Sequence, residues 1–198
     1  MTLTLETPHG PALAHLHEID NPRLAVVLGH GAGGGVAARD IVKAAQAANE
    51  AGASVALIEQ PYRVAGRKSA APAHHLDAAW LAVVDALRGE DPVLCGGRSS
   101  GARVACRTAA GTGAIGVLCL AFPLHPPGRP EKTRLGELEA VEVPVLIVQG
   151  ESDPFGMPPA APAREVVRLR GDHGLKSDRP GLRAAVAGWL ERRLTEAA

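Results

Sequence analysis

The sequence predicts an α/β fold in which a doubly wound, mostly parallel sheet of eight strands is packed between helices. Short apolar runs alternate with amphipathic segments along most of the chain, as in strands joined by helical crossovers. Two of these runs end in glycine-rich turns, at residues 29–35 and 96–101, where a strand would pass into a helix. No repeat or long linker divides the 198 residues, so we expect one domain over residues 1–198.

The expected strands are short apolar runs bounded by glycine, proline or polar residues. The first two, residues 2–6 and 12–19, flank a Pro-His-Gly-Pro turn and predict an antiparallel hairpin. The other six strands are expected at residues 24–28, 54–59, 93–95, 114–122, 145–149 and 165–169. Because a helical segment separates the strands at 24–28 and 54–59, these two should be parallel, with a right-handed crossover.

The expected helices are indicated by apolar side chains that recur every three or four residues. They span residues 36–51, 75–88, 131–139 and 180–194, and one more runs from the turn at 96–101 to residue 110. Their inward-facing side chains include Ile41, Ala45, Ala48, Leu76, Trp80, Val83, Leu87, Leu182, Val186, Trp189 and Leu190. Only one short helix fits between residues 122 and 143, so we expect no cap domain and an open site.

Composition excludes several classes of partner. The formal net charge is zero and the isoelectric point is about 7.1, so we expect no nucleic acid and no membrane as partner. The longest apolar run, residues 114–122, is far too short for a membrane span. Basic residues gather at 63–68 and 129–134, where they form either a solvated rim or a surface for an acidic substrate.

The cysteines and histidines predict no metal site. Cys95, Cys106 and Cys119 fall in expected strands or a helix, and the N-terminus lacks the features of a secretion signal. We therefore interpret them as reduced thiols of a cytoplasmic protein. His15 and His17 lie two apart with no third ligand nearby, which favours an exposed strand face over a metal pair. We expect neither a metal nor a cofactor.

The chemistry is concentrated at Gly97-Arg98-Ser99-Ser100-Gly101, which fits the G-x-S-x-G pattern of a nucleophile elbow. A serine on a very sharp strand-to-helix turn must adopt a strained backbone, and its hydroxyl is then exposed. The two glycines leave room for the neighbouring strand and helix. The alternative is a glycine-rich turn with an incidental serine, but the expected strand and helix on its flanks favour the elbow.

Two more reactive side chains follow expected strand ends. Asp153 and His173 come after Ser99 in the order nucleophile, acid, base. His173 would take the serine proton, and Asp153 would fix the tautomer of the imidazole, so the three predict a catalytic triad. Asp172 is the competing acid. We prefer Asp153 because it follows a strand end directly, whereas two adjacent residues cannot easily turn toward one another.

The glycine loop at residues 29–35 has two interpretations. In the first, the backbone N–H of Ala32, or alternatively of Gly33, joins that of Ser100 to form an oxyanion hole. In the second, Gly29-His30-Gly31-Ala32-Gly33-Gly34 satisfies G-x-G-x-x-G, and Glu59 stands where a ribose-binding acid would stand, which predicts a dinucleotide site. The hairpin before this strand and the histidine in the turn argue against the second.

Two neighbours of the expected site have open roles. Arg98 either binds a substrate carboxylate or braces the loop by pairing with an acid such as Glu151 or Asp153, and we favour bracing. His125 follows a strand end on the rim of the site and either binds substrate, shuttles protons or is a turn residue held by prolines.

Several segments carry a family resemblance that covers nearly the whole chain. They are LCGGRSSGARVA from residue 94, FPLHPPG from residue 122, PVLIVQG from residue 144, and Asp172-His173. These segments resemble the α/β-hydrolase superfamily, and in particular the small group that includes testis-expressed protein 30 and the hydrolase-like domain of a non-specific-lethal complex subunit. The chain is more distantly similar to dienelactone hydrolases, which use a cysteine nucleophile where this chain has Ser99.

The resemblance implies an α/β-hydrolase fold and the same triad. We therefore expect a serine hydrolase that acts on small-molecule esters or thioesters through an acyl-enzyme on Ser99. Some relatives are parts of chromatin complexes, so the alternative is a non-catalytic interaction domain of the same shape, with dinucleotide binding third. A homodimer is left open.

Overall fold

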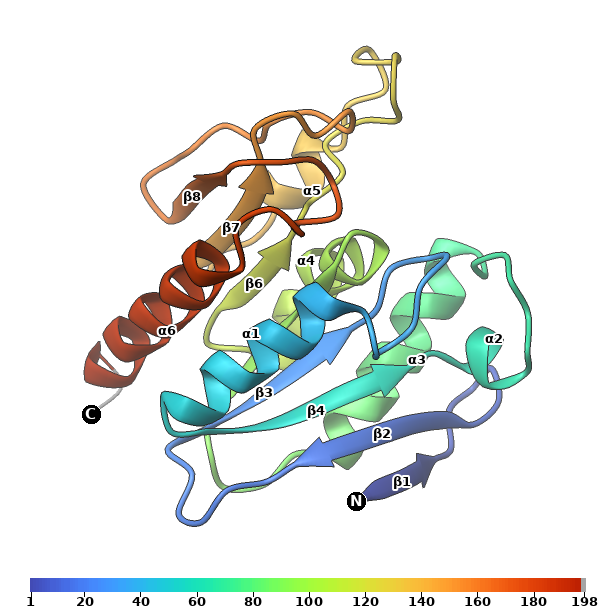
Figure 1. The fold of residues 1–198 in the computed structure, drawn as a ribbon. Helices are drawn as coiled ribbons and strands as arrows, with labels where there is room; N and C mark the ends of the chain where they lie inside the picture. Colours follow the sequence, from blue (N-terminus) through green and yellow to red (C-terminus); the bar gives the residue numbers. More distant parts are fainter. Residues whose placement is uncertain (197–198) are drawn as a thin grey trace.

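The fold is built on a single eight-stranded sheet (Figure 1), seen in a computed structural model that describes residues 1–196. The strand order is β1-β2-β4-β3-β5-β6-β7-β8. β1 and β2 form the predicted antiparallel hairpin, β2 pairs antiparallel with β4, and all later pairs are parallel. The predicted doubly wound, mostly parallel sheet of eight strands is therefore confirmed.

The elements alternate as the sequence predicts. The strands are β1 (Thr2–Leu5), β2 (Ala12–His17), β3 (Leu24–Gly29), β4 (Ala53–Glu59), β5 (Val93–Arg98), β6 (Val117–Leu120), β7 (Val145–Gly150) and β8 (Arg164–Leu169). The helices are α1 (Arg39–Glu50), α2 (Pro61–Val64), α3 (Ala73–Ala86), α4 (Ser100–Thr112), α5 (Leu135–Glu139) and α6 (Arg179–Glu196). None of the helices within residues 1–196 is both long and apolar enough to cross a membrane.

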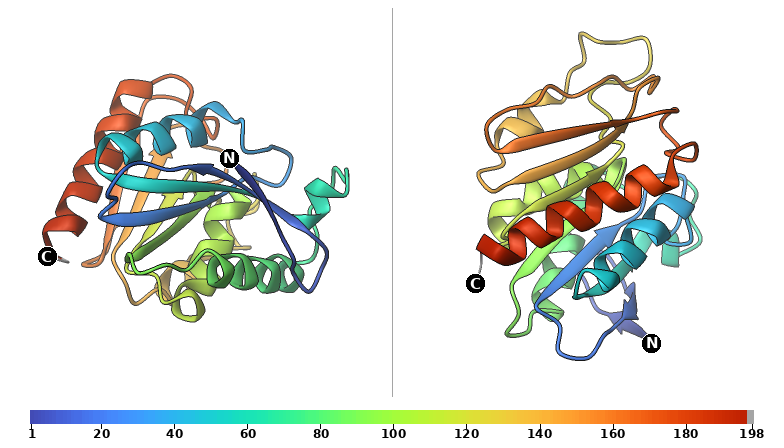
Figure 2. Two further views of the ribbon diagram at one scale, coloured as in Figure 1. Left: turned by 90° about the horizontal axis from the view of Figure 1, so that it is seen from below. Right: turned by 60° about the vertical axis from the view of Figure 1, so that its left-hand side comes forward.

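Helices cover both faces of the sheet (Figure 2). On one face α1 and α6 lie side by side, and Ile41 and Trp189 pack with Leu118 of the sheet. On the other face α3, α4 and α5 bury Trp80 and Leu138 with sheet residues. This arrangement follows from the amphipathic stripes of the helices, since each stripe must be buried against an apolar face of the sheet. Among the described residues, no separate cap domain covers the edge of the sheet.

The strand order reverses at β3. β4 lies on one side of β3 and β5 on the other, and Gly29 of β3 is in register with Gly97 of β5. The chain passes from β3 to α1 on one face of the sheet and from β5 to α4 on the other, so the two loops diverge above the carboxyl ends of the strands. In open α/β sheets, this switch point is where ligands bind.

Several element boundaries differ from those predicted. α1 begins at Arg39 rather than residue 36, so the irregular glycine loop is longer than expected. β6 spans only Val117–Leu120, because Ala121 adopts a φ of 52° that ends the strand. The segment at 61–72, predicted as a loop, begins with the short helix α2, whose first residue is Pro61, a residue favoured at that position.

Candidate active site

The elbow at the end of β5 has the strained backbone that the sequence predicts. Ser99 lies between β5 and α4 with φ 52° and ψ −108°, which is an unfavourable conformation for a residue with a side chain. A Cβ placed on Gly97 or Gly101 would lie 2.5 Å from the carbonyl oxygen of Gly29. Only glycine at both positions lets β3, β5 and α4 approach this closely.

The structure brings Ser99, His173 and Asp153 together from three loops at the carboxyl edge of the sheet. The Oγ of Ser99 lies 2.9 Å from Nε2 of His173. On the other side of the imidazole, Nδ1 lies 2.8 Å from Oδ2 of Asp153. Because a carboxylate only accepts hydrogen bonds, Nδ1–H donates to Asp153, and Nε2 is left free to accept the serine proton.

Asp153 is held from two further directions. Its side chain is 1% exposed, and its carboxylate accepts hydrogen bonds from Nε2 of Gln149 at 2.7 Å and from the backbone N–H of Phe155 at 2.9 Å. Gln149 is fully buried, and its Nε2 also lies 3.1 Å from the carbonyl oxygen of Phe122 and 3.0 Å from that of Gly156, so its two N–H groups are shared among three acceptors. Sequence reasoning missed Gln149, although a glutamine inside an apolar strand was a visible signal, because a buried amide needs partners.

The competing acid, Asp172, takes no part in this chain of hydrogen bonds. It is exposed, and its Oδ1 accepts a hydrogen bond from the N–H of Gly174 at 2.9 Å, within its own turn. The backbone here is also constrained, because a Cβ on Gly150 at the end of β7 would overlap the carbonyl of Asp172. The loop that carries His173 thus rests directly on the end of the strand that leads to Asp153.

The glycine loop after β3 lies against the serine. A Cβ on Gly31 would stand 3.6 Å from Cβ of Ser99. Among the described residues, none accepts a hydrogen bond from the backbone N–H of Ala32, Gly33 or Ser100, and the last of these is the first residue of α4. The sequence predicts these N–H groups as oxyanion donors, and both segments that carry them border Ser99.

Two buried side chains, which sequence reasoning missed, hold the carbonyl side of this loop. His30 accepts a hydrogen bond at Nε2 from the N–H of Gln60 (3.1 Å), so its proton is on Nδ1, which donates to the carbonyl of Gly31 at 2.8 Å. The hydroxyl of Tyr62 donates to the carbonyl of Ala32 at 2.9 Å. With the carbonyls of Gly31 and Ala32 fixed on this side, the loop amides are left for other partners. In the sequence, the signal for His30 was its position inside the glycine loop at residues 29–35.

Lowering the pH is expected to destabilise the protein through His30. Burial lowers the pKa of His30 below its usual 6.5, against the opposing effect of the bond to Gly31 and with the help of the nearby Arg63 charge. Because the unfolded chain then binds the proton more readily than the folded chain, the free energy of unfolding should fall as the pH drops below 6.5 and level off below the folded pKa. Unfolding by urea at several pH values measures this. His30→Gln should remove part of the slope and exposed His17→Gln should keep it; equal slopes for wild type and His30→Gln would contradict the assignment.

Arg98 braces the site, but with a partner other than those predicted. Its Nε donates to Oδ2 of Asp40 at 2.6 Å, and its Nη2 donates to the carbonyl of His173 at 3.1 Å. The prediction that it pairs with Glu151 or Asp153 was wrong. The Asp153 carboxylate faces His173 and Gln149 instead, and the Arg98 side chain extends toward the first turn of α1. Arg98 therefore ties α1 to the loop that carries His173.

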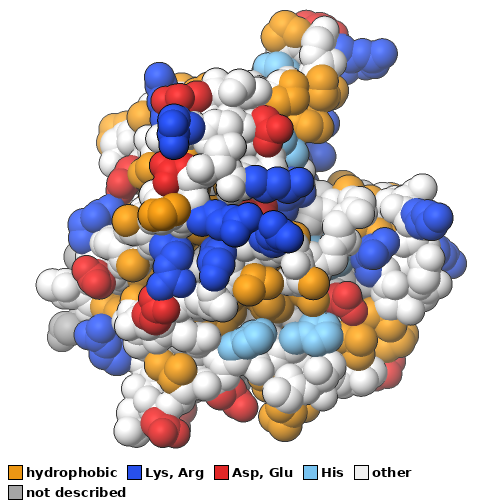
Figure 3. Space-filling model, viewed as in Figure 1, with side chains coloured by type: hydrophobic (Ala, Val, Ile, Leu, Met, Phe, Trp, Pro, Cys, Tyr) orange, Lys and Arg blue, Asp and Glu red, His pale blue; other side chains and the backbone are white. Residues whose placement is uncertain are grey.

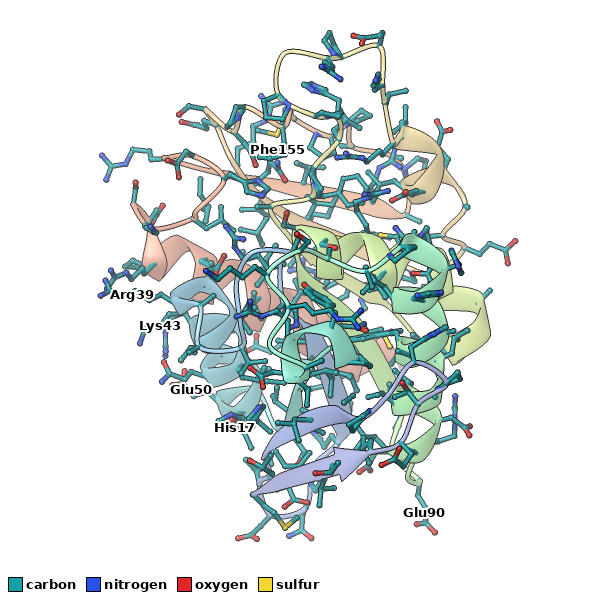
Figure 4. The ribbon with its side chains drawn as sticks, turned by 90° about the vertical axis from the view of Figure 1, so that its right-hand side faces the viewer. His17, Arg39, Lys43, Glu50, Glu90 and Phe155 are labelled. Carbon is teal, nitrogen blue, oxygen red and sulfur yellow. The ribbon has the colours of Figure 1, made fainter. Side chains whose placement is uncertain are left out.

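His125 lies beside the segment that follows Asp153. Its Nδ1 donates to the carbonyl of Pro126 at 2.9 Å, and its backbone N–H donates to the carbonyl of Phe155 at 3.0 Å. The ring of Phe155, labelled in Figure 4, lies over the imidazole of His173, with 4.3 Å between ring centroids. His125 is thus near the site without a hydrogen bond to any of Ser99, Asp153 or His173 among the described residues.

The remaining candidates lie apart from this site. Burial raises the pKa of Cys95 to about 11, so this thiol is protonated and cannot serve as the nucleophile. Within residues 1–196, no group of three or more His, Cys, Asp or Glu side chains is arranged to hold a metal ion. Two observations argue against the dinucleotide site. Glu59 lies 3.6 Å from His15, with which it pairs. In addition, α1 starts several residues after the glycines, whereas a dinucleotide site needs a helix that begins directly after them.

Comparisons with known proteins agree with this architecture. The sequence profile of the alpha/beta hydrolase domain matches residues 22–179, and no curated protein matches the chain. Among solved structures, an a/b serine hydrolase without lid from Xanthomonas campestris is 23% identical, with a TM-score of 0.77 over 97% of this chain and 94% of that one. Est1E from Butyrivibrio proteoclasticus is 16% identical, with a TM-score of 0.78 over 98% and 99%. A dienelactone hydrolase from Anabaena variabilis is 16% identical, with a TM-score of 0.73 over 99% and 96%.

Proposed function

The chain belongs to the alpha/beta hydrolase domain family, and we propose that it is a serine hydrolase that cleaves small esters or thioesters through an acyl-enzyme on Ser99. The observation that carries the proposal is the unbroken chain of hydrogen bonds from Ser99 through His173 to Asp153, mounted on a strained elbow. Within the family, we propose membership of the group that includes testis-expressed protein 30 and the hydrolase-like domain of a non-specific-lethal complex subunit, because the segments quoted above resemble that group.

The proposed reaction begins at the serine hydroxyl. Nε2 of His173 takes the proton as Oγ of Ser99 bonds to the carbonyl carbon of the substrate. The carbonyl oxygen becomes an oxyanion, which the N–H groups of Ser100 and of Ala32 or Gly33 stabilise. Asp153 offsets the positive charge on the imidazole, and Gln149 keeps Asp153 in place.

The reaction is then completed in two stages, acylation and deacylation. The bond to the leaving alcohol or thiol breaks, and His173 gives that group its proton, which leaves an acyl-enzyme. A water molecule next loses a proton to His173 as it attacks the acyl carbon, which forms a second tetrahedral intermediate. When the bond to Oγ breaks, His173 gives this proton to Oγ, so the acid is released and Ser99 is restored. Because no cap domain covers the site among the described residues, small substrates can enter directly from solvent.

Labelling by a fluorophosphonate probe tests the proposal, because such probes react only with an activated serine. Wild type should be labelled, and Ser99→Ala and His173→Ala should not be. Ser152→Ala, which removes an exposed serine outside the hydrogen-bonded chain, is the matched control and should be labelled as wild type is. A folded wild type that stays unlabelled would reject the proposal in favour of a non-catalytic interaction domain.

A further inference from the structure

An open groove of about 640 Å³ lies beside the proposed active site. Its walls come from three parts of the chain that also build the site. The glycine loop contributes Gly33 and Gly34, β5 contributes Arg98, and the loop after β8 contributes Gly174 and Lys176. The start of α1 closes it with Arg39 and Asp40. The groove therefore adjoins chain neighbours of the serine, of the histidine and of the oxyanion donors.

The groove is rich in positive charge. Figure 3 shows Lys and Arg side chains gathered on this face, over the start of α1 and the loop before α6. Three basic side chains line the groove itself: Arg39, Arg98 and Lys176. They come from positions 39, 98 and 176, so this cluster is different from the basic runs at 63–68 and 129–134 that the sequence suggested for an acidic substrate.

Two of these charges are available to a ligand. Arg98 is matched by Asp40, at 2.6 Å. Arg39 and Lys176 are exposed, and no carboxylate among the described residues forms an ion pair with either. Asp172, the other acid nearby, accepts its hydrogen bond from Gly174 rather than from Lys176. Because Arg98 and Asp40 neutralise each other, the groove lining has an excess of two positive charges, those of Arg39 and Lys176.

The positions of these two side chains fit a substrate that is already bound at Ser99. The Lys176 side chain runs back past Gly174, where an added Cβ would lie 3.3 Å from its Cε, and Gly174 directly follows His173. Arg39 opens α1 directly before Asp40, the residue that holds Arg98 beside Ser99, and in Figure 4 its side chain extends away from the body of the protein. An ester held at Ser99 would thus have a cation on each wall of the adjoining groove.

We infer that this groove binds a negatively charged end of the substrate, so that the enzyme prefers esters or thioesters that carry a carboxylate. Arg39 and Lys176 would bind the carboxylate, and Arg98 would hold the wall between the groove and the serine. The inference rests on the proposed hydrolase function and adds the substrate class to it.

Matched pairs of substrates test the inference, each pair differing only in a carboxylate or its neutral carboxamide. Monomethyl adipate against methyl adipamate places the charge on the acyl side, and 3-acetoxybenzoate against 3-acetoxybenzamide places it on the alcohol side. In one pair, wild type should favour the carboxylate about tenfold or more in kcat/KM, and the preference should shrink as salt is raised. Arg39→Gln and Lys176→Gln should each reduce it about three- to fivefold. Lys43→Gln, which removes the same charge from α1 outside the groove, should leave it unchanged.

The outcomes separate the two proposals. Equal turnover of carboxylate and carboxamide in both pairs would overturn the inference and leave the hydrolase function standing. If no ester is turned over, binding decides: Ser99→Ala is titrated calorimetrically with monomethyl adipate and with methyl adipamate. Binding of the carboxylate alone, lost in Ser99→Ala/Lys176→Gln, would support the groove without catalysis, and absence of carboxylate binding would overturn it.

Discussion

Replacing Asp153 with asparagine is expected to lower kcat for the proposed ester hydrolysis about 10⁴-fold, measured well below the melting temperature of the variant. In this site the reason is the hydrogen-bond pattern around the carboxylate. Oδ2 accepts from both His173 and Gln149, and Oδ1 accepts from the N–H of Phe155, so one asparagine oxygen cannot serve all three donors. With this oxygen toward His173, the carboxylate charge that stabilises the imidazolium is lost, and with it toward Phe155, the NH₂ group faces His173. That group donates to Nδ1, the imidazole proton moves to Nε2, and Nε2 can no longer accept the proton of Ser99.

The control for this prediction is the neighbouring acid. Asp172→Asn removes the same charge one residue from His173, but Asp172 only caps its own turn. Its kcat should stay within about twofold of wild type, as for most surface substitutions. Steady-state kinetics on one ester at pH 7 to 8 compares the two variants. If Asp172→Asn loses activity while Asp153→Asn keeps it, the assignment of the acid is wrong.

Replacing Gly101 with alanine is expected to destabilise the protein by about 3 kcal/mol, at the upper end for overpacking. The added Cβ would lie 2.5 Å from the oxygen of Gly29, 2.6 Å from its carbonyl carbon and 2.9 Å from the oxygen of His30. All three are backbone atoms that cannot rotate away, so α4 must move from β3. This shift separates the N–H of Ser100 from the glycine loop, and kcat should fall about 100-fold, as when one oxyanion donor is lost.

Gly136→Ala is the matched control, since Gly136 is also in a helix but has no atom within 4 Å of an added Cβ. There the change should stabilise the protein by about 0.5 kcal/mol, because alanine loses less backbone entropy than glycine in a helix. Urea unfolding gives both stabilities, and kcat is measured well below each melting temperature. A Gly101→Ala variant as stable and active as wild type would show that the close contact between α4 and β3 is not required.

The sequence by itself determined the order and type of the main elements, because each depends on local patterns. Apolar runs of strand length, helical stripes such as Leu76, Trp80 and Val83, and the hairpin turn were all visible in adjacent residues. The elbow was visible too, since its strain arises within five residues. The exact end of β6 was not, because Ala121 adopts its positive φ in the context of β7, whose Val148 carbonyl accepts its N–H.

The residues of the site divide in the same way. Ser99, Asp153 and His173 could be selected in advance because the carboxyl ends of parallel strands meet at one edge, so a local pattern implied a spatial meeting. Only the tertiary structure decided that Arg98 pairs with Asp40, that His30 and Tyr62 fix the glycine loop, and that Arg39 and Lys176 face one groove. Tyr62 and Ala32 are 30 residues apart in the sequence, Arg98 and Asp40 are 58 apart, and Arg39 and Lys176 come from different elements. How these residues meet is set by the packing of whole helices and loops, which no local pattern encodes.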